Sequence, residues 1–447
     1  MSERSVVVVG GGLAGITAAL DLRDAGAAVT LLEVRPRLGG AAYSFERDGL
    51  WLDNGQHVFL RCCTAYRELL ERLGTTEHTV LQERLSIPVL APGRKTAWLT
   101  RTNLPAPLHL ATSLLRYRHL TARERLSAAL AARKLAQVDP ASPEADRQSF
   151  GAWLTTQRQS PRALDALWEL ISRPTLNLRA EEISLAAAAF VFRTGLLERA
   201  DNGDLGYARV PLQRVHGDAA LRLLEAKEVE VRLGLRVSAI EPGFTVVGQG
   251  ERFRAQAVVL AVPHERAAGL LPAGALSEPE TLTTLGSAPI VNLHIVYDRP
   301  VLEHEFAAAV DSPVQYVFDR TASAGLTKGQ CLAISLSAAD EEIETPADQL
   351  KDKLHRALGE ILKAAQQAEV ERFVVTRERF ATPRLAPGTW LSRPGPQTAL
   401  DGLAIAGAWT DTGWPATMEG AVRSGHAAAR ATLKALGRER ALQEAAA

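Results

Sequence analysis

Three glycines near the N-terminus have the spacing of a turn that binds a dinucleotide. A β-branched run ends in Gly10-x-Gly12-x-x-Gly15. Glycines at these positions permit a tight turn, a close approach of backbone amides to a pyrophosphate, and close packing of the next helix on the strand. The first helical residues, Leu13 and Ala14, would face the phosphates, because aligned peptide dipoles and unpaired N–H groups favour an anion there.

An acidic residue and a second glycine pair follow this turn. Glu33 ends the next apolar run, at the place where a carboxylate can accept hydrogen bonds from ribose hydroxyls. Gly39 and Gly40 come soon after and can let the backbone pass beside the pyrophosphate, where Arg37 would supply positive charge. Enzymes that bind NAD rarely need this second pair, so the pattern favours FAD.

A third glycine-containing segment lies close to the C-terminus. An apolar run ends at Gly407, a polar loop containing Asp411 follows, and a helix is predicted to begin near Met418. A helix N-terminus that faces a flavin stabilises negative charge on its reduced form. The segment resembles the one that closes the cofactor site in the large flavoprotein group of amine oxidases and carotenoid desaturases. The resemblance implies that the two ends of the chain share one cofactor and that the intervening residues are inserted into the dinucleotide-binding fold.

The predicted fold class is therefore α/β, with a Rossmann-type FAD-binding domain and an inserted mixed α+β substrate domain that includes a helical cap. We expect the FAD-binding domain to comprise residues 1–80, 206–270 and 396–447. The substrate domain would comprise residues 81–205, with the cap, and residues 271–395, with a second sheet.

Hydrophobic periodicity supplies the individual elements. Helices are predicted over residues 59–82, 212–226 and 346–366. Residues 103–172 are also predicted to be helical, with breaks at Pro105, Pro107, residues 139–143 and Ser160-Pro161, the last of which opens a new helix. A strand pair or bent strand is predicted over residues 229–240, a hairpin over 243–256, a buried strand that returns to the dinucleotide-binding sheet over 257–263, and strands of the second sheet over 290–298, 331–337 and 371–380.

Composition narrows the class of protein. The 51 basic and 51 acidic residues balance, so no net positive field draws the chain to nucleic acid. No run of about 18 uncharged apolar residues predicts a spanning helix, and the first strand begins too early for a signal peptide.

The three cysteines suggest a reducing compartment, hence the cytoplasm. We predict that the adjacent Cys62 and Cys63 are packing residues, and the alternative is a redox role. The histidines show no metal-ligand spacing, so no metal is expected.

Five segments together carry a resemblance to a known family. They are Arg35-Pro-Arg-Leu-Gly-Gly40, Asp53-Asn-Gly-Gln-His57, Pro174-Thr-Leu-Asn177, Gly206-Tyr-Ala-Arg-Val-Pro-Leu212 and Pro415-Ala-Thr-Met-Glu-Gly-Ala-Val-Arg-Ser-Gly425. The chain resembles the squalene-associated FAD-dependent desaturases of hopanoid-producing bacteria, within the larger group of amine oxidases and carotenoid desaturases.

That resemblance implies a function and further cofactor contacts. The family's characterised activity is the reductive removal of the hydroxyl group of hydroxysqualene to give squalene, so a long apolar isoprenoid is the implied substrate. The resemblance also implies that the backbone near Val237 brackets the adenine ring and that Gln56 and His57 contact the cofactor. Ala41 and Ala408 stand where many relatives carry Arg and Asp. Arg37 and Asp411 are then the candidates to hold the phosphate and ribityl groups.

Removal of an allylic hydroxyl needs a proton donor, and His57 is the leading candidate because its pKa lies near neutral pH. The alternative is that His57 only hydrogen-bonds the flavin or its own loop. Asp53 lies in the same loop. Asn177 can bond the substrate hydroxyl or end a turn after Pro174. Tyr207 is a further candidate donor, although a tyrosine before a strand usually packs.

Three other functions stay open from the sequence. A flavin amine oxidase is disfavoured because Thr417 precedes Met418 where amine oxidases resemble one another in carrying Tyr. A carotenoid-type desaturase would oxidise a polyprenyl chain with the same motifs. A lipid escort without flavin would have no physical reason to keep the glycines and Glu33.

Residues 108–134 alternate leucines with arginines and contain few acids. Such a basic amphipathic pattern can lie on anionic lipid, for example peripherally on the inner face of the cell membrane. The alternative is an ordinary solvated face of the cap.

Overall fold

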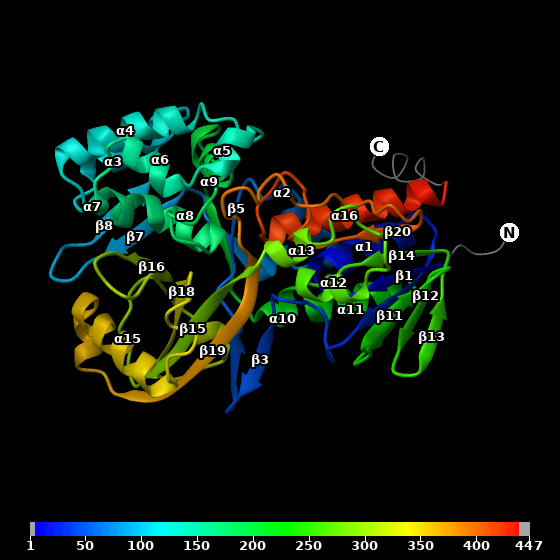
Figure 1. The fold of residues 1–447 in the computed structure, drawn as a ribbon. Helices are drawn as coiled ribbons and strands as arrows, with labels where there is room; N and C mark the ends of the chain where they lie inside the picture. The colour runs from blue at the N-terminus through cyan, green and yellow to red at the C-terminus, as the bar shows by residue number, and fades with distance from the viewer. Residues whose placement is uncertain (1–4, 438–447) are drawn as a thin grey trace.

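The computed structural model describes residues 5–437. A five-stranded sheet forms the centre of the half at the right of Figure 1, with the strand order β10-β2-β1-β14-β20 and parallel pairing throughout. Its strands are Ser5–Val9 (β1), Ala28–Glu33 (β2), Glu230–Leu233 (β10), Ala257–Leu260 (β14) and Leu403–Ile405 (β20). Segments from the beginning, middle and end of the chain thus share one sheet, as the insertion predicted from the glycine motifs requires.

Both faces of this sheet are covered, which is why its strands are almost continuously apolar. Val6 and Val8 face a helical layer, whereas Val7 and Val9 face the opposite side. The helical layer comprises Leu13–Asp24 (α1), Thr64–Leu73 (α2), Leu212–Val215 (α10), Gly217–Ala226 (α11) and Met418–Ala435 (α16). The opposite face is covered by a small antiparallel sheet of Val237–Glu241 (β11), Thr245–Gly248 (β12) and Glu251–Arg254 (β13), and by His264–Leu270 (α12) and Thr281–Thr284 (α13).

A seven-stranded sheet forms the centre of the other half, with the order β19-β15-β18-β17-β16-β7-β8. Its strands are Ser86–Leu90 (β7), Ala97–Thr100 (β8), Ser287–Tyr297 (β15), Phe306–Ala309 (β16), Tyr316–Asp319 (β17), Gln330–Ser337 (β18) and Val370–Pro383 (β19). The three strands predicted here are confirmed. The predicted helix over 346–366 is shorter, because Ala347–Ile361 (α15) is followed by a separate turn over residues 363–366.

A group of helices lies at one end of this sheet (Figure 1). The helices are Ala111–Arg116 (α3), Ala122–Leu135 (α4), Pro143–Arg147 (α5), Phe150–Thr156 (α6), Pro161–Ala163 (α7), Glu169–Leu176 (α8) and Leu185–Phe192 (α9). Their shared core contains stacked and edge-on aromatic rings, among them Phe150, Trp168 and Phe192. Within residues 5–437, no helix combines the length and the apolar composition that a membrane crossing needs. The domain boundaries given above stay a prediction.

The predicted helix over residues 59–82 is wrong at both of its ends. Only α2 is α-helical, the left-handed Gly74 ends it, and a short 3₁₀ helix, Thr76–His78, follows. Val58–Leu60 (β5) and Thr79–Leu81 (β6) are strands that pair with Leu205–Ala208 (β9). A partner strand from distant sequence overrides the local helical periodicity here.

Candidate FAD and substrate site

Two of the three motif glycines are required by the protein's own packing. Gly10 has a φ of +109°, and a Cβ atom there would lie 2.3 Å from the carbonyl oxygen of Ala261. A Cβ on Gly15 would lie 1.9 Å from the carbonyl oxygen of Gly10. Such contacts are far inside normal atomic separations, so the strand, turn and helix fit together only with glycine at these positions.

Gly12 differs, because the chain itself leaves room for a side chain. Its φ is −76°, which any residue adopts. A Cβ there would meet only the Cα atom of Gly40, at an ordinary 3.7 Å. Gly40 in turn has a φ of +59°, and its own Cβ would lie 2.7 Å from the Cα of Gly12. The two glycine segments therefore meet backbone to backbone, and the open space at Gly12 fits a pyrophosphate beside the amides of Leu13 and Ala14 at the start of α1.

The carboxylate of Glu33 is fixed beside the same turn. It is buried at the end of β2 and accepts hydrogen bonds from Gly11 N at 2.6 Å and Arg35 N at 2.8 Å. The carbonyl of Glu33 also accepts from Leu235 N at 2.9 Å, which holds the chain leading to Val237 next to this corner. Val237 begins β11 at a bulge opposite Gly248. Glu33 and Val237 thus occupy one corner of the fold, as expected for groups that hold an adenosine.

Two buried donors in the predicted cofactor segments have no hydrogen-bond partner among the described residues. They are Nη1 of Arg37 and Nε2 of Gln56. The Arg37 guanidinium lies 3.4 Å from the ring centroid of Tyr43, and burial lowers its pKa. A buried unpaired donor costs about 1 to 3 kcal/mol. An anionic cofactor that supplies acceptor atoms removes that cost, so both residues fit FAD.

The C-terminal segment presents a capped helix to the same half of the molecule. Gly407 has a φ of +148°, and its N–H donates to Ser424 Oγ at 2.9 Å. Thr417 caps α16 by accepting from Gly420 N, so Met418 is the first helical residue, as predicted. The side chain of Asp411 is 52% exposed and lies 3.7 Å from an Arg393 nitrogen. Its expected contact with the ribityl group stays a prediction.

Asp53 is held on both carboxylate oxygens. Oδ1 accepts from Ser44 Oγ at 2.6 Å and from Leu212 N at 3.1 Å. Oδ2 accepts from Arg320 Nη2 at 2.7 Å, and both members of this ion pair are buried. The carboxylate therefore joins the FAD-binding half to the strand end that carries Arg320, and this geometry favours a positioning role for Asp53.

Asn54 ties the same loop to the second sheet. Its side chain accepts from Tyr43 N and donates to Ala41 O at 2.9 Å and Glu378 Oε1 at 3.0 Å. Its backbone carbonyl accepts from Asn292 Nδ2 at 3.1 Å. The loop that contains Gln56 and His57 is thus fixed from both halves of the molecule.

His57 lies in this loop, partly buried. Its Nδ1 is 3.1 Å from the carbonyl oxygen of Gly55, a distance that places a proton on Nδ1. Burial lowers the pKa of His57, while the carbonyl of Gly55 and the negative charge of Asp53 oppose that shift. His216 is fully buried with its Nε2 2.8 Å from the hydroxyl of Tyr66, and burial together with His57 lowers its pKa to about 3. His216 is therefore neutral at physiological pH.

The other two candidates have their polar groups occupied. The Tyr207 hydroxyl donates to the carboxylate of Glu305, and burial and this contact raise the pKa of Tyr207. Asn177 adopts the left-handed conformation at the end of α8 and donates to Ala288 O and Thr382 Oγ1, each at 3.0 Å, while its oxygen accepts from Ala338 N at 2.7 Å. These contacts favour the turn alternative for Asn177 and disfavour Tyr207 as a donor.

Comparison with known proteins places this geometry in a family. The family described as flavin-containing amine oxidoreductases matches residues 13–433. The chain belongs to this family. It is similar to the hydroxysqualene dehydroxylase of Rhodopseudomonas palustris, at 30% identity over 97% of this chain and 99% of that protein. A second hydroxysqualene dehydroxylase, from Sinorhizobium fredii, is 27% identical over 95% of this chain and 97% of its own length.

Other relatives are more distant. The 15-cis-phytoene desaturase of Solanum lycopersicum is 25% identical over 96% of this chain and 77% of its own length. A solved structure of a putrescine oxidase variant superposes with a TM-score of 0.72 at 21% identity, over 97% of this chain and 99% of that one. Cyclohexylamine oxidase from Brevibacterium oxydans superposes with a TM-score of 0.72 at 18% identity, over 97% of this chain and 100% of that one. These structures confirm the predicted fold class.

As a flavin-containing amine oxidoreductase, the chain is an FAD-dependent enzyme, and the fit of its glycines, Glu33 and Arg37 agrees with that cofactor. Sequence reasoning missed the residues of the second sheet that hold the loop of this oxidoreductase, namely Asn292, His294, Arg320 and Glu378. One signal was present, because Asn292 and His294 are polar residues two apart in the otherwise apolar strand β15 and so share a face.

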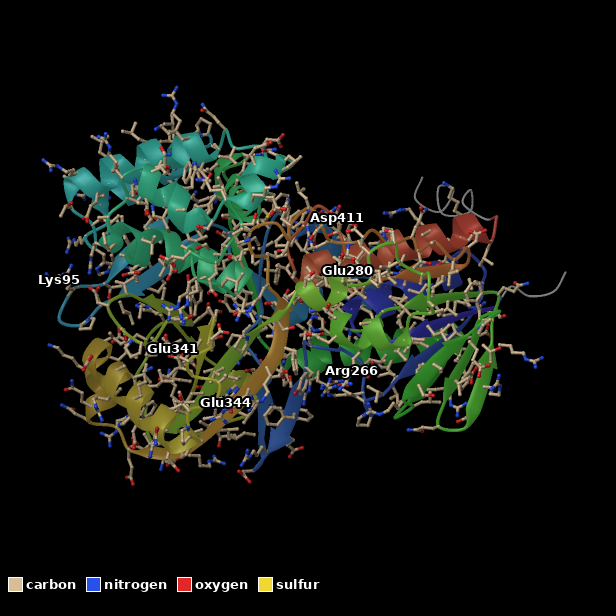
Figure 2. The ribbon with its side chains drawn as sticks, in the orientation of Figure 1. Lys95, Arg266, Glu280, Glu341, Glu344 and Asp411 are labelled. Atoms are coloured by element: carbon tan, nitrogen blue, oxygen red, sulfur yellow. The ribbon has the colours of Figure 1, made fainter. Side chains whose placement is uncertain are left out.

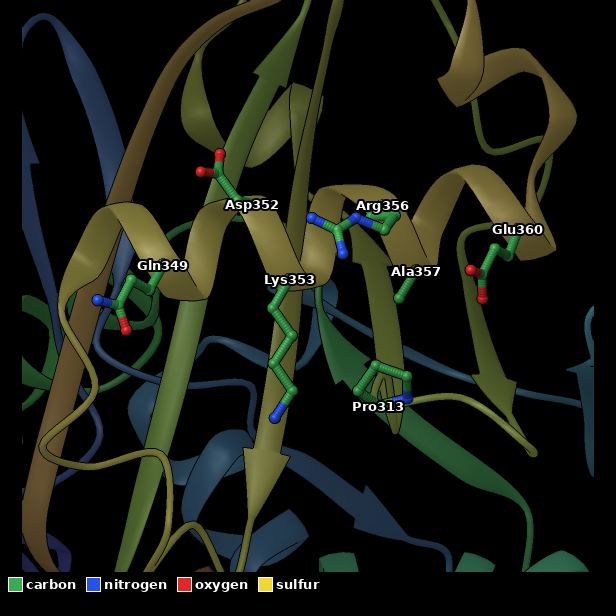
Figure 3. A pocket seen from close by; sticks show the side chains of 7 residues that line it. All are labelled: Pro313, Gln349, Asp352, Lys353, Arg356, Ala357 and Glu360. Atoms are coloured by element: carbon green, nitrogen blue, oxygen red, sulfur yellow. The ribbon is translucent and has the colours of Figure 1, made fainter.

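Charged grooves elsewhere on this oxidoreductase do not suit an apolar substrate. A groove of about 450 Å³ runs along α15 (Figure 3). Asp352, Lys353, Arg356 and Glu360 all line it. Among residues 5–437, no group of three or more His, Cys, Asp or Glu side chains is arranged to hold a metal ion.

Proposed function

We propose that the protein removes the hydroxyl group of hydroxysqualene reductively to give squalene. The observation that carries this proposal is the similarity to the Rhodopseudomonas palustris hydroxysqualene dehydroxylase, which extends over nearly the full length of both chains at 30% identity. The match covers 97% of this chain and 99% of that protein, so it includes the cofactor half as well as the inserted residues. The substrate class would be a long apolar isoprenoid alcohol, and the product would belong to squalene and hopanoid biosynthesis.

The reaction balances with one proton and one hydride. The carbon–oxygen bond breaks and the hydroxyl group, once protonated, departs as water. When bound in its reduced form, FAD would supply the hydride for the new carbon–hydrogen bond and would be oxidised in turn. The protein must hold the substrate carbon near the cofactor, exclude bulk water from the allylic cation, and deliver the proton to the departing oxygen.

His57 is the proton donor in this proposal. Its loop is held by the FAD-binding half through Asp53 and Asn54 and by the second sheet through Asn292, so the imidazole has a defined position. Its lowered pKa makes the protonated imidazole a stronger acid than an exposed histidine, and it also reduces the protonated fraction at neutral pH. The nearby charge of Asp53 favours the protonated form and limits that loss.

A carotenoid-type desaturase is the second candidate function, and the similarity to phytoene desaturases supports it. That reaction removes hydrogen and needs no protonated leaving group. A flavin amine oxidase has less support, because the amine oxidase structures are 22% identical or less and carry only the fold. Thr417 also caps α16 where a tyrosine would stand beside the flavin.

Product analysis separates these functions. Purified holoenzyme is incubated anaerobically with hydroxysqualene and a chemical reductant, and in parallel with phytoene and an electron acceptor. The proposal predicts squalene in the first reaction and unchanged phytoene in the second. Desaturated phytoene without any squalene would replace the proposed function with the desaturase.

A further inference from the structure

Helix α4 turns two of its three leucines away from the protein and buries the third, Leu135. Leu126 and Leu130 are 64% and 56% exposed, whereas Ala128 and Ala131 are buried against the cap. A helix on the surface of a globular protein normally buries its large apolar residues and exposes its polar ones. The outward leucines of α4 therefore form a stripe that the fold of this chain does not use.

Neighbouring elements extend this stripe. Leu115 in α3 is 71% exposed, and Leu108, in the short helix Leu108–Leu110 (η2), is 56% exposed. The loop before η2 adds Leu104. Of the ten exposed large hydrophobic residues among the described ones, five lie between residues 104 and 130. The Arg125 guanidinium donates to the carbonyl of Leu115 and joins α3 to α4.

Positive charge surrounds these leucines. The chain as a whole has equal numbers of acidic and basic residues, but residues 94–134 contain nine basic residues and one acidic residue, Glu124. Glu124 is occupied as a helix cap, since it accepts from the backbone of Thr121. Arg116, Arg123 and Arg133 are exposed and form no ion pair with any described residue. We call the five leucines and these three arginines the docking surface.

We propose that the docking surface binds peripherally to an anionic lipid bilayer. Aliphatic side chains flanked by arginines are the pattern of helices that lie in the membrane interface, with the apolar groups at the acyl boundary and the cations at the phosphates. Nucleic acid would pair with the arginines but leave the leucines in water. An acidic protein is the competing partner, yet protein interfaces favour several aromatic anchors, and here five exposed leucines stand beside a single exposed aromatic residue of β8, Trp98.

The position of the docking surface in the fold suits contact with a bilayer. Helices α3 and α4 lie at the far end of the cap from the N-terminal strand β1, and Lys95 projects at the outer edge of the same half (Figures 1 and 2). The FAD-binding half would then stand away from the bilayer. The proposal does not rest on the proposed function, although a water-insoluble substrate would be reached from such a position.

Flotation of the full-length holoenzyme with lipid vesicles tests the proposal. Vesicles of phosphatidylcholine alone are compared with vesicles that also contain phosphatidylglycerol. The proposal predicts binding to the anionic vesicles only, and weaker binding as salt is raised, because salt screens the arginine–phosphate attraction.

Variants then assign the binding to the docking surface. Replacing Arg116, Arg123 and Arg133 together by Gln should weaken partition into anionic vesicles on the order of 100-fold, since each basic residue near such a surface is worth about 1 kcal/mol. Leu126→Gln with Leu130→Gln should weaken it about 10-fold or more. Matched controls lie elsewhere on the surface. They are the exposed Phe380→Gln on β19 and the unpaired cationic triple Arg254→Gln, Arg266→Gln and Lys328→Gln.

Two results would overturn the proposal. One is a wild-type protein that stays unbound on anionic vesicles at low salt. The other is an equal loss of vesicle binding when the control residues Arg254, Arg266 and Lys328 are replaced. Binding would then depend on the total positive charge and not on the docking surface. A dimer that the leucine substitutions dissociate, in a protein that ignores vesicles, would assign the face to a second copy of the chain. Because binding is measured without turnover, failure here leaves the proposed dehydroxylation untouched.

Discussion

Replacement of Gly12 by alanine should remove the cofactor without harming the fold. An added Cβ would meet nothing closer than 3.7 Å, and the backbone at φ −76° and ψ 177° is open to alanine. The apoprotein should therefore keep its stability within about 1 kcal/mol, and can gain because alanine restricts the unfolded chain. FAD, by contrast, would lose the approach of its pyrophosphate to the turn.

The size of the FAD effect follows from the contacts that would be lost. Hydrogen bonds from backbone amides to a charged group contribute about 1.5 to 3 kcal/mol each. Loss of two of them amounts to about 3 to 6 kcal/mol, or roughly a 100- to 10,000-fold weaker affinity. Fluorescence titration of the apoprotein with FAD measures this affinity, and thermal unfolding of the same samples measures stability.

Two other glycines make the comparison decisive. Gly269→Ala adds a methyl group to a helix where nothing lies within 4 Å, so FAD affinity should be unchanged and stability should be the same or higher by about 1 kcal/mol or less. Gly15→Ala places a methyl group 1.9 Å from a backbone oxygen, so the fold itself should be destabilised by about 1 to 3 kcal/mol or more. A Gly12→Ala protein that binds FAD as tightly as wild type would refute the assignment of the pyrophosphate to this turn.

Three further predictions concern charge. Arg37→Gln should lower FAD affinity roughly 10- to 100-fold. The unfolding temperature should change little, because the guanidinium has an unpaired nitrogen in the apoprotein. An unchanged dissociation constant for FAD would contradict the contact between Arg37 and the phosphate. Asp53→Asn should destabilise the protein by about 3 to 5 kcal/mol in denaturant unfolding, since it leaves the buried Arg320 without its carboxylate. Asp298→Asn, which breaks a solvent-exposed pair, should have a much smaller effect, and equal losses in the two variants would refute this difference. If His57 donates the proton, FAD-loaded His57→Ala should reoxidise its flavin with hydroxysqualene about 100- to 10,000-fold more slowly. The wild-type rate should then rise as the pH falls through and below 6.5, because the pKa of His57 is lowered, and a pH-independent rate would argue for the loop role instead.

Local patterns were sufficient to predict the strand, turn and helix positions in the cofactor half of the site, while the contacts of these residues with FAD stay predictions. The glycine spacing, Glu33 and the start of α16 at Met418 are encoded within short windows, where strand, turn and helix signals agree with each other. The return of residues 257–260 to the same sheet was also predictable, because a fully apolar run of that length is typical of a buried parallel strand.

Pairing between residues far apart in the sequence determines the parts of the fold and of the site that local patterns do not predict. Residues 58–60 and 79–81 have helical periodicity and become strands only because β9 pairs with both of them. The ion pair between Asp53 and Arg320 joins residues 267 positions apart, and no local pattern indicates it. The arginines and leucines of residues 108–134 were visible in the sequence, but only the structure shows that α4 exposes Leu126 and Leu130 while it buries Ala128 and Ala131.

Single-turnover reoxidation of the reduced enzyme by hydroxysqualene tests the central claim most directly. The FAD-loaded protein is reduced anaerobically with dithionite, mixed with substrate, and followed by the return of the yellow absorbance of oxidised flavin, with squalene measured in the same sample. If the enzyme removes the hydroxyl group of hydroxysqualene, flavin reoxidation and squalene formation share one rate constant, and one squalene forms for each flavin oxidised. Flavin that stays reduced in the presence of hydroxysqualene, in a protein that is fully loaded and correctly folded, would contradict it.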